Sequence, residues 1–404
     1  MRIFTLLLCV AVAVAVPAAQ APTATLDIYY IDTEGGQATL FVSPTHQSVL
    51  VDTGNAGSRD PDRIVEAARA AGIQQIDYLV VTHYHGDHIG GFLELSKKIP
   101  IVNIVDHGPT VQPEQVSPSR TLYEETKAKG HYTVAKPGDR VPVTGVTWTI
   151  VTAAGKTLKT NVAGAPGAGT ANTLCAEFKP KDVQVDLENA MSTGSLIAFG
   201  KFRTIDLGDL LWNVEGDLMC PINHIGTVDV YLTTHHGLDW SNSKQTVHAL
   251  QPRVAIMNNG TRKGGQLETF QTLETSPGLE DLWQLHWSYN GLLEHNAPAR
   301  FIANIDDNAQ LSAVIANPPV PATSVIGAPP ARGGGVGGPA PAPAGAPAPA
   351  VAGTAPQPSA YPAGPQGTAA HTPSYWIKVS ARADGSFTVT NSRNGFSKTY
   401  AARR

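Results

Sequence analysis

The chain has 404 residues, of which 42% are hydrophobic and 15% are charged, so it is long enough to form one large hydrophobic core or two domains. This composition excludes a protein that is disordered throughout. The formal net charge of -4 gives no general attraction to nucleic acid or to an anionic membrane surface, so a polyanionic ligand would need a local basic groove or a metal ion.

The first 21 residues have the features of a secretory signal peptide. Arg2 precedes an apolar run from Ile3 to Val16, and small residues follow as far as Ala21. The run is shorter than the ~20 residues that a membrane-spanning helix needs, and no stop-transfer flank follows it. We therefore expect residues 1–21 to be a signal peptide and the protein to be secreted or periplasmic, with no membrane span. Cys175 and Cys220 then remain, either as a disulfide or as free thiols.

Residues 22–316 alternate short β-rich runs with amphipathic helical segments, which predicts an α/β domain whose helices cover sheets. Strands are expected at residues 26–32, 38–43, 48–52, 77–82, 101–106, 146–152, 195–200, 202–207, 228–234 and 253–258. Helices are expected at residues 61–72 with Asp60 as the N-cap, at 89–99, and at 119–130.

The C-terminal part of the chain changes in composition. Residues 317–372 repeat proline, alanine and glycine, which predicts a disordered spacer that cannot form a core. Residues 373–404 alternate again around Asp384-Gly385, a typical hairpin turn. Because so short a hairpin is not stable alone, we expect it to complete the main domain.

The sequence VVTHYHGDHIGG places His83, His85, Asp87 and His88 within six residues. The simplest alternative is a polar loop after a strand, but burying such groups is costly unless they are paired or bind a metal. Imidazoles and a carboxylate are typical zinc ligands, and the segment lies at the carboxyl end of an expected strand, where α/β sheets usually place their sites. We expect His83 and His85 to bind one ion while Asp87 and His88 face a second.

This motif resembles the His-x-His-x-Asp-His signature of the metallo-β-lactamase fold superfamily. Three further motifs follow the same resemblance in chain order: VDTG at residues 51–54, IDLGDL with Asp209, and TTHHGL at residues 233–238. The resemblance implies an αββα sandwich and a divalent metal centre, with two zinc ions expected and manganese as an alternative. It also implies that the aspartate of VDTG orients the site and that Asp209 bridges the two ions.

Four segments carry a narrower resemblance: IDTEGGQATL, NAMSTGSLIAFGKFRTIDLGDL, VDVYLTTHHG and VAIMNNG. With them, the chain looks most like the extracytoplasmic β-lactamase-like domain of ComEC-type competence proteins. Many superfamily members have another metal-binding histidine before the strand that leads to the bridging aspartate. This chain has Asn189 and Ser192 in that region, as ComEC-type relatives do, and no histidine between His131 and His224. The first metal position therefore lacks an expected ligand.

His235 and His236 are adjacent, and neighbouring residues on a strand or a turn point in different directions. We therefore expect one to bind metal and the other to contact substrate, and we favour His236 as the ligand and His235 as the proton donor. Which of the two binds metal stays open at this point.

The sequence predicts a secreted, metal-dependent hydrolase in which Asp87 orients the attacking water. A small-molecule or phosphodiester substrate is expected, with weak nucleic-acid binding and an undefined oligomeric state. The alternatives are a lactonase or β-lactamase-type hydrolase, or a non-catalytic metal-binding relative.

Overall fold

The computed structural model describes residues 24–113, 117–182, 187–305 and 374–403. The expected signal peptide and the expected spacer at residues 317–372 lie outside these ranges. Within the described ranges, no helix combines the length and the apolar character that crossing a bilayer would require.

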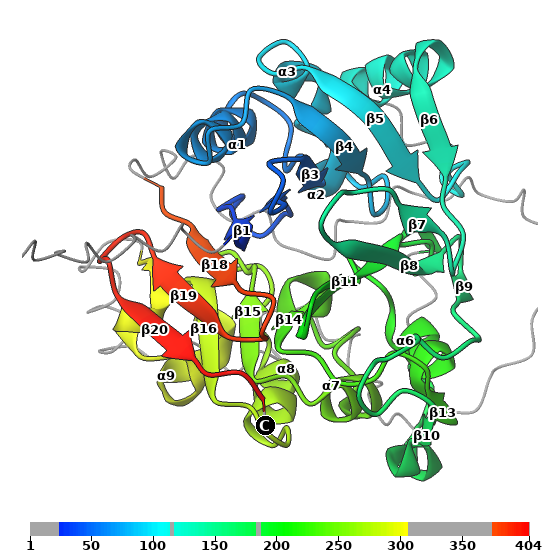
Figure 1. The fold of residues 1–404 in the computed structure, drawn as a ribbon, viewed down its shortest axis with the longest axis vertical. Helices are drawn as coiled ribbons and strands as arrows, with labels where there is room; N and C mark the ends of the chain where they lie inside the picture. The colour runs from blue at the N-terminus through cyan, green and yellow to red at the C-terminus, as the bar shows by residue number, and fades with distance from the viewer. Residues whose placement is uncertain (1–23, 114–116, 183–186, 306–373, 404) are drawn as a thin grey trace, which may run out of the picture.

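The first sheet combines strands from both ends of the chain (Figure 1). Its order is β20-β19-β18-β1-β2-β3-β4-β5-β6; the pairs from β3 to β6 are parallel and the others are antiparallel. The strands are β1 (Leu26–Tyr30), β2 (Thr39–Val42), β3 (Ser48–Val51), β4 (Ile76–Val80), β5 (Ile101–Asp106), β6 (His131–Val134), β18 (Ile377–Ala381), β19 (Phe387–Asn391) and β20 (Ser397–Tyr400).

The second sheet has the order β17-β16-β15-β14-β12-β11-β8-β7, with β9 paired to β8. Its pairs from β12 to β17 are parallel, and the pairs among β7, β8, β9, β11 and β12 are antiparallel. The strands are β7 (Arg140–Val141), β8 (Thr147–Ala153), β9 (Lys156–Thr157), β11 (Gly194–Phe199), β12 (Phe202–Asp206), β14 (Val230–Leu232), β15 (Val254–Met257), β16 (Asp281–His286) and β17 (Ile302–Asn304). Two short strands, β10 (Thr170–Ala171) and β13 (Ile222–Asn223), pair separately.

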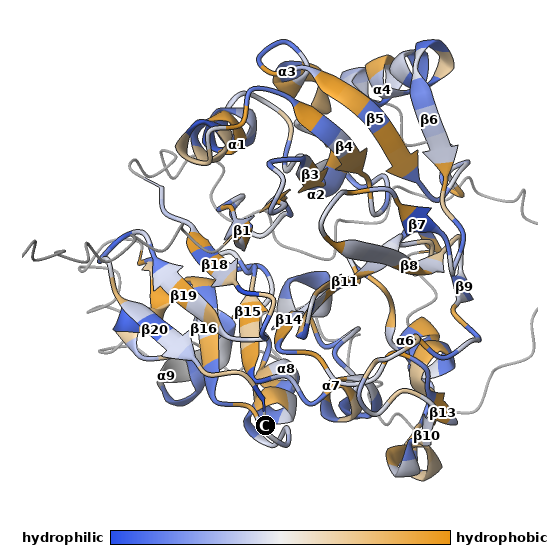
Figure 2. Ribbon diagram, in the orientation of Figure 1, coloured by the Kyte–Doolittle hydropathy of each residue, from blue (hydrophilic) through white to orange (hydrophobic). Residues whose placement is uncertain are grey.

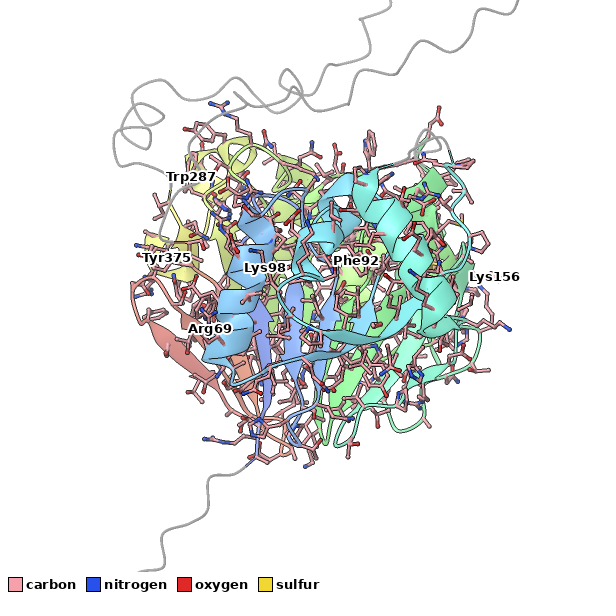
Figure 3. The ribbon with its side chains drawn as sticks, turned by 90° about the horizontal axis from the view of Figure 1, so that it is seen from above. Arg69, Phe92, Lys98, Lys156, Trp287 and Tyr375 are labelled. Atoms are coloured by element: carbon pink, nitrogen blue, oxygen red, sulfur yellow. A yellow bond between two sulfur atoms is a disulfide. The ribbon has the colours of Figure 1, made fainter. Side chains whose placement is uncertain are left out.

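Helices cover the outer face of each sheet. One apolar cluster joins the first sheet to α1, α3 and α4, which lie across that sheet in the view from above (Figure 3). A second cluster joins the other sheet to α6, α7 and α8. The helices are α1 (Arg59–Ala70), α2 (Gly86–Ile89), α3 (Phe92–Leu95), α4 (Pro118–Lys129), α5 (Leu187–Ala190), α6 (Trp212–Met219), α7 (Lys244–Leu250), α8 (Leu267–Glu274) and α9 (Leu292–His295), with 3-10 helices η1 (Thr173–Glu177), η2 (Thr234–Gly237), η3 (Tyr289–Gly291) and η4 (Ala299–Phe301).

The largest apolar cluster lies between the two sheets and contains residues from both. Phe41 of β2 and Trp148 of β8, for example, pack edge to face with ring centroids 4.9 Å apart. The inner strands are correspondingly rich in hydrophobic residues (Figure 2). The protein therefore has four layers in the order αββα, which confirms the fold class expected from the sequence.

The C-terminal residues form three strands and pair with β1 through β18. Tyr400 on β20 also reaches the second sheet, where its hydroxyl donates to Asp281 at 2.6 Å and accepts from the indole of Trp283 at 3.0 Å. Asn304 and Tyr375, which flank the undescribed residues 306–373, hydrogen-bond each other twice at 2.9 Å. The chain therefore leaves the second sheet after Asn304 and returns to the fold beside the same residue, at Tyr375.

Two local expectations need correction, and one open alternative is resolved. Helix α1 begins at Arg59 with Ser58 as its N-cap, so Asp60 lies inside the first turn; its carboxylate accepts instead from the backbone N–H of Asn55 at 2.7 Å. The helix expected at residues 89–99 is replaced by the two short helices α2 and α3. Cys175 and Cys220 form a disulfide.

Candidate metal centre

The predicted ligands lie on loops that follow parallel strands of both sheets. The segment from His83 to His88 follows β4 of the first sheet, whereas Asp209 follows β12 and the pair His235 and His236 follows β14 of the second. The carboxyl ends of these strands meet at one edge of the sandwich, because His88 and Asp209 are in direct contact there. The site is thus assembled from two halves of the fold.

Two glycines allow the loop after β4 to pack closely against its neighbours. A Cβ atom at Gly90 would lie 2.0 Å from the carbonyl oxygen of Gly86, and one at Gly91 would lie 2.1 Å from that of Thr53. The backbone N–H of Thr53 donates to the carbonyl of His88 at 2.6 Å. The Gly-Gly pair therefore ends α2 and holds His88 against the loop that follows β3.

Asp52 orients the His88 ring. It has a left-handed backbone with φ of 60°, and its Oδ2 lies 2.7 Å from Nδ1 of His88. The backbone N–H and the hydroxyl of Thr82 also donate to this carboxylate, at 2.8 and 2.6 Å. With Nδ1 bound in this way, His88 presents Nε2 to the centre of the site, as a carboxylate partner does for many metal-binding histidines.

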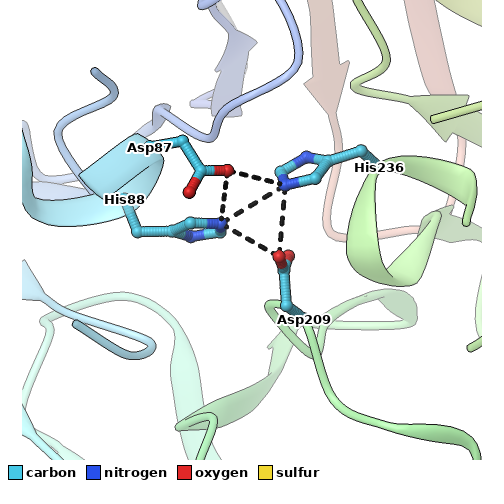
Figure 4. Close-up of side chains that lie close together, drawn as sticks. All are labelled: Asp87, His88, Asp209 and His236. Atoms are coloured by element: carbon cyan, nitrogen blue, oxygen red, sulfur yellow. Dashed lines mark hydrogen bonds and ion pairs between the residues drawn. The ribbon is translucent and has the colours of Figure 1, made fainter. Parts of the chain in front are cut away.

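Asp87, His88, Asp209 and His236 form one compact group, in which one ligand atom from each residue lies within 4.8 Å of all the others (Figure 4). Nε2 of His88 lies 3.3 Å from Nε2 of His236, 3.2 Å from Oδ2 of Asp209 and 3.5 Å from Oδ2 of Asp87. Nε2 of His236 lies 3.3 Å from Asp209 and 3.4 Å from Asp87. The structure therefore brings together four of the six predicted ligands in a single group.

His83 and His85 lie beside this group. Their facing atoms, Nε2 of His83 and Nδ1 of His85, are 2.9 Å apart, and Nε2 of His83 lies 3.9 Å from Oδ2 of Asp209. His83 is fully buried, whereas His85 is partly exposed and its Nε2 lies 3.3 Å from the side-chain oxygen of Gln112. The remaining two predicted ligands thus form a separate pair that shares Asp209 with the first group.

The two adjacent histidines turn toward the same atom. His235 and His236 have left-handed backbones, with φ of 55° and 56°, inside η2. Their Nε2 atoms lie 3.4 and 3.3 Å from Oδ2 of Asp209. Both rings therefore reach the Asp209 carboxylate from a turn whose backbone is left-handed rather than extended as in a strand.

Burial and neighbouring charges set the protonation of the site. Burial alone would raise the pKa values of Asp209 and Asp87, but the nearby imidazoles, together with the Lys263 ammonium at Asp87, hold both pKa values well below their usual range. Burial holds the pKa of His83 well below its usual range and lowers that of His235 to about 4. The site therefore combines ionised carboxylates with neutral imidazoles at His83 and His235, the forms that bind metal. By contrast, the carboxylates of Asp209, Asp87 and Asp52 hold the pKa of His88 well above its usual range.

The residues present fit a divalent cation. Oδ1 of Asp209 is buried without a hydrogen-bond partner among the described residues. Two imidazole nitrogens 3.3 Å apart can share at most one proton with each other, and two carboxylate oxygens face the same point. A bound ion would satisfy these atoms together, and the two nitrogen and two oxygen donors suit zinc or manganese.

Glu188 was not identified from the sequence, although it links two parts of the site. Its Oε1 accepts from the backbone N–H of Tyr84 at 3.2 Å and lies 2.9 Å from Nε2 of His107, which is therefore a partnered loop histidine. The neighbouring Asn189 lies with its Nδ2 3.4 Å from Nε2 of His235. The only sequence signal for Glu188 was its place beside Asn189, where a ligand was expected.

Comparison with known proteins agrees with this geometry. Residues 32–157 match the family model described as the metallo-beta-lactamase superfamily, and this range contains Asp52 and the segment from His83 to His88. Residues 32–157 are therefore part of a metallo-β-lactamase superfamily domain. Asp209, His235 and His236 lie beyond the matched range.

The chain also resembles individual proteins over shorter stretches. A 110-residue segment is 32% identical to hydroxyacylglutathione hydrolase of Klebsiella pneumoniae and covers 27% of this chain and 35% of that protein. A 72-residue segment is 33% identical to the beta-lactamase-like protein 2 homolog of Caenorhabditis elegans and covers 16% of this chain and 24% of that protein. The metallo-beta-lactamase fold protein YhfI of Bacillus subtilis aligns with a TM-score of 0.39 and 11% identity, over 65% of this chain and 96% of that one. Because the matched segments span only about a quarter to a third of the two curated relatives, their activities describe those proteins alone.

Proposed function

We propose that this protein is an exported, metal-dependent hydrolase with two divalent ions, and that it cleaves phosphodiesters. The observation that carries the proposal is the convergence of Asp87, His88, Asp209 and His236 within 4.8 Å, beside the second pair His83 and His85. The two groups share the Asp209 carboxylate, which supports a centre of two ions rather than one.

When bound, two divalent ions lower the pKa of water and polarise the bond that is attacked. The chain's own residues would position the reactants. The ionised Oδ2 of Asp87 would orient the attacking water, while Asp52 fixes the His88 ring so that its Nε2 faces the centre. No serine or cysteine nucleophile is required.

Lys263 supports an anionic substrate. It lies on the loop after β15, and its ammonium forms an ion pair with Asp87 while its side chain remains 25% exposed. The neighbouring Arg262 stacks its guanidinium over the Tyr289 ring at 4.5 Å. A phosphodiester held at the metal centre beside Asp87 would meet the Lys263 charge, which would stabilise its developing negative charge.

Two further features support the finer assignments. The Cys175–Cys220 disulfide supports export, because disulfides persist mainly in oxidising compartments. The absence of a histidine at Asn189 and Ser192 supports the resemblance to the ComEC-type extracytoplasmic domain, whose relatives share these residues.

A second candidate is an acyl hydrolase that acts on a thioester, a lactone or a β-lactam. It is favoured by the 32% identity with hydroxyacylglutathione hydrolase over 110 residues. The same carboxylates would position water for attack on a carbonyl carbon, so the substrate must be decided by assay.

The test is a substrate panel on purified protein with zinc or manganese added. We expect elemental analysis to find bound metal and bis(p-nitrophenyl) phosphate to be hydrolysed, with nitrocefin and acyl-homoserine lactones unchanged. Turnover of the lactone or nitrocefin without phosphodiester cleavage would favour the acyl hydrolase. Absence of bound metal after repletion would contradict both candidates and leave a non-catalytic relative.

Replacing Lys263 distinguishes the phosphodiester substrate from the acyl substrate more directly. Lys263→Gln should raise KM for the anionic phosphodiester and leave KM for a neutral lactone unchanged, because only the anion interacts with the ammonium charge. Lys201→Gln is the matched control, since Lys201 is an exposed lysine in the turn between β11 and β12. Equal KM values for the phosphodiester in all three proteins would contradict the assigned role of Lys263.

A further inference from the structure

The metal position beside His83 and His85 has only two imidazoles from its own loop. Their facing nitrogens are 2.9 Å apart, and Asp209 is the next acidic neighbour at 3.9 Å from His83. A zinc ion in proteins usually has at least three protein ligands. A third protein ligand is therefore needed at this position, and a further imidazole is one residue type that can supply it.

The segment from Glu188 to Thr193 lies along this side of the site. Glu188 accepts from the backbone N–H of Tyr84, which lies between His83 and His85 in the sequence. At the other end of the segment, the backbone N–H of Thr193 donates to the carbonyl of Thr82 at 2.8 Å. Asn189, within this segment, is therefore held near the His83 and His85 pair.

His235 meets Asn189 at this place. Nε2 of His235 lies 3.4 Å from Nδ2 of Asn189 and 3.4 Å from Oδ2 of Asp209. His235 is not part of the compact group formed by His236 with Asp87, His88 and Asp209.

The contacts of the His235 ring favour a metal-binding tautomer. Nδ1 lies 3.4 Å from the hydroxyl oxygen of Ser241, which can accept a hydrogen bond from the proton on Nδ1. Nε2 then carries a lone pair, which can accept a weak hydrogen bond from the Asn189 amide. Oδ1 of Asn189 is buried without a partner among the described residues, so Asn189 has no stronger interaction that competes with this one.

We propose that Nε2 of His235 is the third imidazole ligand of the metal position formed by His83 and His85, supplied by the turn after β14 in place of the histidine that is absent near Asn189. Asn189 is a positioning residue that holds the His235 ring. This inference rests on the proposed two-metal function, and it replaces the proton-donor role expected from the sequence. The left-handed backbone of the pair is what lets His235 and His236 serve two different ions.

The experiment counts bound ions. Mature wild-type protein and His235→Asn are stripped of metal, titrated with Co²⁺, and followed by the visible absorption of the bound ion and by elemental analysis. Asparagine tolerates the left-handed backbone at position 235, so the variant should keep the turn. We expect about two ions in the wild type and about one in the variant.

Three further variants complete the design. His236→Asn should also lose one ion but give a different absorption spectrum, because it removes a ligand of the other group. Asn189→His combined with His235→Asn should recover the second ion. His131→Asn, at an exposed position on β6, is the matched control and should bind as the wild type does.

The outcomes separate the inference from the proposed function. Two ions with wild-type affinity in His235→Asn would overturn the inference and leave the two-metal hydrolase standing. Fewer than two ions in the wild type would overturn both. If His235→Asn does not fold, His235→Gly suits the same left-handed backbone, and added imidazole should then restore the second ion; failure of that restoration in a folded protein also overturns the inference.

Discussion

Replacing Asp52 with asparagine tests how strongly the fold supports the metal centre. The Asp52 carboxylate lies 2.7 Å from Nδ1 of His88, and both side chains are fully buried. Asparagine can accept through only one oxygen, so it cannot satisfy His88 and both donors of Thr82. Loss of such a partner typically weakens metal binding by about 10- to 100-fold, or ~1.4–2.8 kcal/mol. The same range follows from exchanging a charged hydrogen bond for a neutral one, about 1–2 kcal/mol.

Competition with a chromophoric zinc chelator measures this loss directly. Asp52→Asn should weaken one of the two zinc dissociation constants, that of the position containing His88, and affect the other less. Asp62→Asn is the control, because Asp62 is exposed on α1 and pairs with Lys98 at the surface. If Asp52→Asn folds and both zinc affinities stay within about twofold of the wild type, well below the expected 10- to 100-fold, then Asp52 does not support the metal through His88.

Three predictions concern stability. Burial raises the pKa of Glu215 from 4.5 to about 7, so its contribution to stability is complete below pH 4.5 and is lost as the pH rises to 7, a change of about 3 kcal/mol in the free energy of unfolding. Urea unfolding of Glu215→Gln should show a smaller pH dependence over this range, and an unchanged dependence would refute the assignment. Replacing Cys175 and Cys220 with serine removes a cross-link between residues 45 apart and should lower the free energy of unfolding by about 4 kcal/mol; an unchanged melting temperature would contradict this. Deleting residues 374–403 should abolish cooperative unfolding, whereas replacing residues 317–372 with a short glycine-serine linker should hardly change the melting temperature, because the flanking residues already hydrogen-bond each other. Calorimetry distinguishes the two deletions, and the opposite result would show that the boundary is wrong.

The sequence by itself determined the layered α/β fold and the set of residues that could bind metal. The expected strands all have counterparts in the structure, because alternating or continuous apolar runs bounded by turn residues specify strands locally. The ligands were identifiable for a related reason. They lie directly after these strands, and histidine and aspartate concentrated at such positions have few structural explanations.

Local details failed where close packing overrides local preference. Asp60 is a good N-cap residue by type, but its carboxylate binds the Asn55 loop and the helix begins at Arg59, before Asp60. The helix expected after His88 is interrupted at Gly90 and Gly91, because the backbones of these glycines pack closely against a loop that is distant in the sequence. In both cases the deciding contact is with a loop and not with the helix itself.

Only the tertiary structure decided how the ligands are grouped. Asp87 and His88 come together with Asp209 and His236 because the two sheets pack face to face and bring the ends of β4, β12 and β14 to one edge. The direction of His235 depends on a left-handed backbone that its sequence does not specify, since histidine adopts this conformation only where surrounding contacts hold it. Contacts between residues more than a hundred positions apart, such as that of Lys263 with Asp87, follow from the packing of the sheets, because residue type and spacing along the chain carry no information about which distant loops will meet.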